Sequence, residues 1–158
     1  MRTRTAHRYE TRIRYDKVME DGKQKKVTEQ YVVDALSFGE AEEAIAKEMR
    51  TYISGEFEVK AITPTAYGEI FFSDNSSDDR WYKAKLSFIT IDEKTEKEKR
   101  SSVNYLVQAS SVQSAVKNVE EVMGTTMIDY VIAAITETKI MDVFEHKAQA
   151  NDDKPEVE

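Results

Sequence analysis

The sequence predicts an α+β protein built from two consecutive β-β-α-β-β units, each an antiparallel sheet with one helix packed on one face. Apolar and polar residues alternate over several segments, which is typical of half-buried strands. Apolar residues at spacings of three and four mark one helix in each half. The same order of elements occurs twice along the 158 residues, of which 40% are hydrophobic. We therefore expect a globular protein with enough apolar side chains to build a core.

The repeat is visible when the second half of the chain is placed under the first. Residues 9–15 match 82–88, with apolar or small residues at the same alternate places. Residues 31–35 match 105–109, and Ala-Ile-Thr at 61–63 recurs at 134–136. Self-similarity of this kind indicates a duplicated structural unit, and we expect the two copies to pack with approximate two-fold symmetry.

Turn and cap signals separate the elements of the first copy. Asp21-Gly22 is a hairpin signal between two alternating strands at 9–19 and 26–36. Ser37 and Glu40 form a capping box at the start of the helix. A third strand begins at Phe57 and ends at Pro64, and a short fourth strand covers 67–72. The corresponding segments of the second copy are 81–91, 99–109, 111–123, 127–136 and 139–145, with Ser114 in place of the capping glutamate.

The domain boundaries follow from this pattern. We expect a first repeat at 8–72, a linker at 73–79, a second repeat at 80–145 and a disordered acidic tail at 146–158. The linker, Ser-Asp-Asn-Ser-Ser-Asp-Asp, is polar and short.

The composition argues against several classes of chemistry. The chain has no cysteine and two histidines, His7 and His146, both outside the patterned segments. The sequence shows no glycine-rich phosphate loop, no Ser-His-Asp set and no metal-spaced cluster. We therefore expect a non-enzymatic protein with no cofactor and no metal, and the enzyme alternative is a carboxylate-based hydrolase. No apolar run reaches the length of a membrane helix, so we expect a cytoplasmic protein with no membrane partner.

The candidate binding surface is the face of each predicted sheet that points away from its helix. Basic and amide groups beside an aromatic ring could hold phosphates and stack a base. A solvated face with cross-strand charge pairs, or a subunit interface, is also compatible with this pattern. The predicted ligand-binding residues are Arg12, Arg14, Gln30, Trp81, Lys83, Lys85, Asn104 and Gln108.

Five stretches resemble a known family: residues 27–38, 52–57, 69–74, 79–83 and 138–144. The family is a domain of unknown function found in uncharacterised proteins of gut Bacteroidetes and their phages, and the resemblance covers roughly residues 8–145. It carries no catalytic residues over to this chain. A phage setting implies a small accessory protein that binds nucleic acid, a nucleotide signal or a host protein.

Our functional hypothesis is accordingly a binding protein, expected to be a homodimer, with nucleic acid or a nucleotide as its ligand. The alternative is a structural or protein-interaction module that uses the same sheet face to contact another subunit or a host or phage protein.

Overall fold

A computed structural model describes residues 1–4 and 7–145, and its fold is α+β. The described residues form two helices and nine strands, and the strands make two sheets. The predicted fold class is therefore confirmed at this level. The chain divides into two compact units, each with one sheet and one helix.

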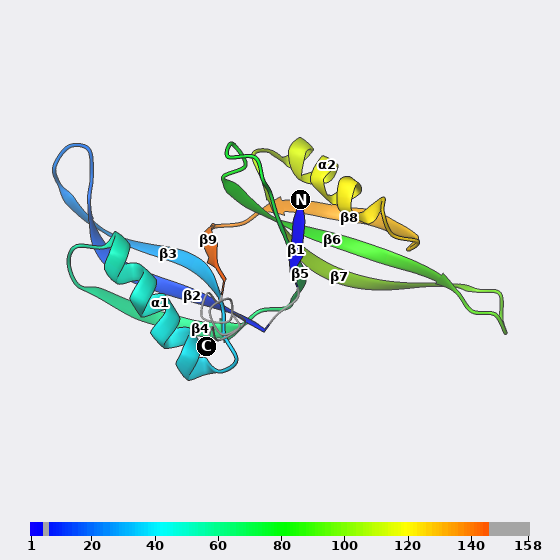
Figure 1. Ribbon diagram of the computed structural model, residues 1–158, viewed down its shortest axis with the longest axis horizontal. Coiled ribbons are helices and arrows are strands. Elements are labelled where there is room, and N and C mark those ends of the chain that lie inside the picture. Colours follow the sequence, from blue (N-terminus) through cyan, green and yellow to red (C-terminus); the bar gives the residue numbers. More distant parts are fainter. Residues whose placement is uncertain (5–6, 146–158) are drawn as a thin grey trace, which may run out of the picture. The chain divides into compact units, whose positions relative to one another are not determined.

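The four-stranded unit combines residues 7–65 with 140–145. Its strand order is β4-β2-β3-β9, and α1 lies across one face of this sheet (Figure 1). The element bounds are β2 (Arg8–Val18), β3 (Gln24–Asp34), α1 (Phe38–Tyr52), β4 (Phe57–Pro64) and β9 (Ile140–Phe144).

The five-stranded unit combines residues 1–4 with 66–139. Its strand order is β1-β5-β7-β6-β8, with α2 on one face (Figure 1). The element bounds are β1 (Arg2–Arg4), β5 (Tyr67–Phe72), β6 (Arg80–Ile91), β7 (Glu98–Ala109), α2 (Val112–Met123) and β8 (Tyr130–Glu137).

The fourth strand of each predicted repeat does not join the sheet of its own repeat, and this corrects the expectation of antiparallel sheets. β5 pairs in parallel with β7, and β9 pairs in parallel with β3. Ile70, Phe71 and Phe72 of β5 are all buried. A strand with apolar side chains on both faces suits the interior of a sheet, and β5 lies between β1 and β7.

The segment 73–79 is also not a linker between the two units, because it joins β5 to β6 inside the five-stranded unit. The backbone N–H of Ser73 donates to the side-chain oxygen of Gln108 at 2.9 Å. Asn75 Oδ1 accepts from the backbone N–H of Ser77 at 3.0 Å, and Asp78 is buried. These contacts make the segment a structured turn. The predicted tail, 146–158, lies outside the described residues.

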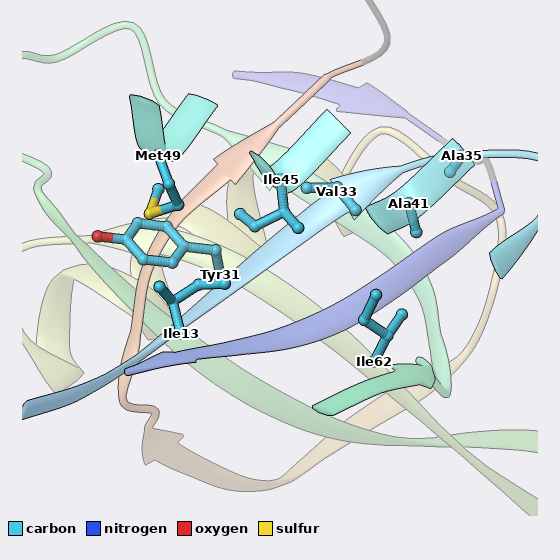
Figure 2. Close-up of a cluster of buried hydrophobic side chains, with 8 residues drawn as sticks. All are labelled: Ile13, Tyr31, Val33, Ala35, Ala41, Ile45, Met49 and Ile62. Atoms are coloured by element: carbon cyan, nitrogen blue, oxygen red, sulfur yellow. The ribbon is translucent and has the colours of Figure 1, made fainter. Parts of the chain in front are cut away.

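The core of the four-stranded unit lies between α1 and the sheet. Every fourth residue of α1 is buried, and Figure 2 shows these side chains facing those of the strands. The residues of this cluster are Ile13, Tyr31, Val33, Ala35, Ala41, Ile45, Met49 and Ile62. α2 buries Ala115, Val119 and Met123 at the same spacing in the other unit.

Both helices begin at a serine cap, but the two caps are completed differently. Ser37 Oγ accepts from the backbone N–H of Glu40 at 3.2 Å, while the Glu40 carboxylate accepts from the N–H of Leu36 at 2.9 Å. In α2 the Ser114 hydroxyl takes the place of the capping glutamate, because it accepts a hydrogen bond from the backbone N–H of Ser111 at 2.9 Å. A serine at this position therefore completes a capping box.

Candidate ligand-binding face

The central part of the β6–β7 face opposite α2 is basic and carries no carboxylate. Tyr82, Ala84 and Leu86 point to the helix side and are buried. Since side chains alternate along a strand, Lys83 and Lys85 point to the opposite face, where both are exposed. Their cross-strand neighbours are Leu106 and Asn104, and the next row pairs Ser87 with Ser102.

The equivalent face of the four-stranded unit has interleaved charges. Arg12 pairs with Gln30 and Arg14 with Thr28 across β2 and β3, and both arginines are exposed. Arg14 lines a shallow hollow whose walls contain more acidic than basic side chains. The residues that line it are Arg14, Tyr15, Asp16, Lys26, Glu56, Phe57 and Glu58. Carboxylates beside Arg14 disfavour an anionic ligand at this point.

The four basic side chains of the predicted set have no ion-pair partner within the described part of the chain. Arg12, Arg14, Lys83 and Lys85 are all exposed, and none forms an ion pair with another described residue. Such cations are available to an anionic ligand at little cost, because no existing ion pair has to be broken.

Two of the predicted ligand-binding residues have structural roles instead. The Trp81 side chain is buried, and its ring packs edge-on against Phe72 with ring centroids 5.6 Å apart. It therefore offers no exposed surface on which a base can stack. The Gln108 side chain accepts the hydrogen bond from Ser73, which holds the β5–β6 turn.

The predicted set is also divided between the two units. Arg12, Arg14 and Gln30 lie in the four-stranded unit, whereas Lys83, Lys85 and Asn104 lie in the five-stranded unit. Each group is a small patch on its own sheet.

Sequence reasoning missed a carboxylate on the helix side of the four-stranded sheet. The phenols of Tyr15 and Tyr31 each donate to Glu29 Oε1 at 3.0 Å, and Lys17 Nζ lies 3.8 Å from Glu29 Oε2. Only 12% of the Glu29 side chain is exposed. The signal was present, because Glu29 stands in the otherwise apolar row of Val27, Tyr31 and Val33.

This cluster changes the acidity of the two phenols. Burial, together with the hydrogen bond and the charge of Glu29, raises the pKa of Tyr15 to about 12. Burial and the same carboxylate also raise the pKa of Tyr31. Both phenols therefore remain protonated at neutral pH and act as hydrogen-bond donors to Glu29.

No group of three or more His, Cys, Asp or Glu side chains is placed to hold a metal ion in residues 1–4 and 7–145. No described helix has the length and apolar character needed to cross a membrane.

Together these features define a class: an α+β protein of two helix-backed sheets with a basic patch on the β6–β7 face opposite α2. The family is shown by a match over residues 8–146 to the model described as "Domain of unknown function (DUF4494)". The chain belongs to this family. No curated protein and no solved structure matches the chain.

Proposed function

We propose that the chain is a non-enzymatic binding protein that holds single-stranded nucleic acid against the Lys83–Lys85 face of the five-stranded unit. The observation that carries this proposal is the pair of exposed lysines, without ion-pair partners, on a face whose central rows contain no carboxylate. Asn104 beside Lys85, and Ser87 with Ser102, add hydrogen-bonding groups suited to phosphate and sugar oxygens.

The ligand contacts in this proposal are to the backbone of the nucleic acid. Because Trp81 is buried, no aromatic platform is available on these rows for stacking. Binding should then be independent of sequence and strongly dependent on salt, since it arises from the release of counterions by phosphate contacts. The net charge of −7 opposes binding at long range, so the affinity should be modest.

Fluorescence anisotropy of a labelled single-stranded oligonucleotide over a salt series tests the proposal. Lys83→Glu with Lys85→Glu should abolish binding at low salt. Lys94→Glu with Lys97→Glu is the matched control, because it changes the net charge equally on the β6–β7 hairpin loop, away from these rows. The proposal fails if the wild type does not bind at low salt, or if both double variants weaken binding equally.

We also infer that the two units descend from one duplicated β-β-α-β-β unit. Two correspondences between the units support this inference. β4 flanks β2 as β8 flanks β6, and the cross-strand pairs Arg12–Gln30 and Lys85–Asn104 occupy corresponding rows of the two sheets. The binding face would then be a feature acquired by one copy, because the row of the other copy that corresponds to Lys83–Leu106 holds the carboxylate of Glu10.

A further inference from the structure

The edge strands β4 and β8 occupy corresponding places in their sheets but differ in the residues at their free edges. β4 carries Glu58 and Lys60 and ends at Pro64. Charges and proline are among the devices by which edge strands avoid pairing with other chains, and the β-bulge that both strands carry is another. In β8 the corresponding places hold Val131, Ala133 and Glu137.

β8 is therefore an eight-residue edge without a charged residue before its last position. Val131 is 40% exposed, and Met127 and Ile128, just before the strand, are 100% and 47% exposed. An exposed apolar edge strand is a template for pairing with a further strand.

The backbone of β8 shows which residues can make that pairing. The N–H of Thr138 donates to Trp81 O, and the N–H of Ile89 donates to Asp129 O, both at 2.9 Å. The backbone groups of successive residues point alternately toward and away from the neighbouring strand, and the bulge at Ala133 interrupts this alternation. Counted inward from Thr138 and from Asp129, the residues whose backbone groups point away from β6 are Tyr130, Ile132, Ile135 and Glu137.

These four residues are self-complementary about a two-fold axis. In an antiparallel pair of two β8 strands centred between Ala133 and Ala134, Ile132 lies opposite Ile135 of the other copy, and Tyr130 lies opposite Glu137. In each of these pairs, both residues direct their backbone groups toward the other copy, and both side chains lie on the same face of the joined sheet. In the same register, Val131 lies opposite Thr136 of the other copy. A two-fold interface requires this kind of self-complementarity.

We propose that two copies of the chain dimerise by antiparallel pairing of their β8 strands, which joins two five-stranded sheets into one continuous sheet. The inference is independent of the proposed function. The dimer would nevertheless affect the proposed binding face, because a two-fold axis perpendicular to the sheet keeps the Lys83–Lys85 faces of both copies on the same side. Two β6 strands would lie about 14 Å apart, three strand spacings, across the interface.

Size-exclusion chromatography with light scattering tests the dimer and its register. The wild type should give twice the 18.2 kDa of one chain. Val131→Lys with Thr136→Lys places like charges directly opposite each other in the pair, and it should give single-chain mass. Val131→Lys with Thr136→Glu places opposite charges there, and it should restore the double mass.

The matched control is Glu58→Lys with Thr63→Lys at the same places on β4, which should leave the mass unchanged. Both β8 positions are exposed, so circular dichroism should show unaltered folding in every variant. A wild type of single-chain mass across a dilution series overturns the proposal. So does a Lys/Lys variant that stays dimeric, a Lys/Glu variant that stays monomeric, or a β4 control that dissociates.

Discussion

Arg8 Nε lies 3.0 Å from Asp34 Oδ1, and both side chains are almost fully buried, with 0% and 2% exposed. The two residues are direct partners at the end of the β2–β3 ladder. The corresponding row of the five-stranded unit holds Trp81 and Gln108, which carry no charge. The ion pair is therefore particular to the four-stranded unit.

Removing one member of this pair should be strongly destabilising, because the other charge is left buried without its partner. Asp34→Ala should lower the free energy of unfolding by about 3–5 kcal/mol, measured by urea denaturation. The double variant Arg8→Met with Asp34→Leu should lose much less, since it buries no charge. If the double variant is as unstable as Asp34→Ala, the isolated charge is not the cause.

The burial of Tyr15 and Tyr31 beside the Glu29 carboxylate should make the folded protein sensitive to alkaline pH. The pKa of Tyr15 is raised to about 12 and that of Tyr31 is also raised, so the folded state holds protons that the unfolded state releases near pH 10. Their contribution to stability is fully present below about pH 10 and is lost as pH rises through 12. Urea unfolding at a series of alkaline pH values should show this fall.

Glu29→Gln separates the two causes of the raised pKa values. Glutamine keeps an acceptor for the phenols but removes the negative charge, so the phenolate absorbance should appear at lower pH than in the wild type. Burial is the larger cause for both tyrosines, and a part of the shift should therefore persist. Identical phenolate titrations in the two proteins would contradict a role for Glu29.

Ser114 should account for a measurable part of the stability of α2. Its hydroxyl accepts from the backbone N–H of Ser111 and of Ser110 at 2.9 and 3.0 Å. Ser114→Ala removes this acceptor and should cost about 1 kcal/mol, seen as a lower midpoint in urea. Ser114→Glu places the usual capping-box residue there and should restore the midpoint. A variant Ser114→Glu as unstable as Ser114→Ala would rule out the capping role.

The sequence predicted the elements well because each depends on local signals. The Asp21-Gly22 turn is an example: Gly22 has a φ of +82°, which favours glycine, and Asp21 Oδ1 accepts from the N–H of Lys23 at 2.9 Å. The helix stripe of Ala41, Ile45 and Met49 is buried as its spacing predicts.

The strands with which β5 and β9 pair, β7 and β3 respectively, could not be predicted in the same way. Only Thr65 and Ala66 separate β4 from β5, and so short a connection normally joins two neighbouring strands of a hairpin. Which sheet a strand enters depends on contacts distant in sequence, and the alternation of β5 carries no information on them. The continuous apolar run Ile70-Phe71-Phe72 is typical of a strand buried on both faces.

The same limit applies to the candidate site. Alternation correctly placed Lys83 and Lys85 on the face opposite the helix, where both are exposed. It placed Trp81 on that face too, but alternation does not show that Phe72 of another strand packs against the ring. To predict whether a side chain on a sheet face is exposed, one must therefore know which strand lies beside it, and the local pattern does not provide this.

The single tryptophan of the chain makes the burial of Trp81 directly measurable. A ring that is 2% exposed and packed against Phe72 should emit at short wavelength and resist quenching by acrylamide until the protein unfolds. Phe72→Ala opens space beside the ring, so it should increase quenching and lower the free energy of unfolding by about 3–5 kcal/mol. Phe88→Ala is the control, because Phe88 contacts Tyr105 rather than Trp81, and it should leave the quenching unchanged. If acrylamide quenches Trp81 as readily in the native protein as in the unfolded chain, the ring is accessible, and it could stack with a base of the ligand.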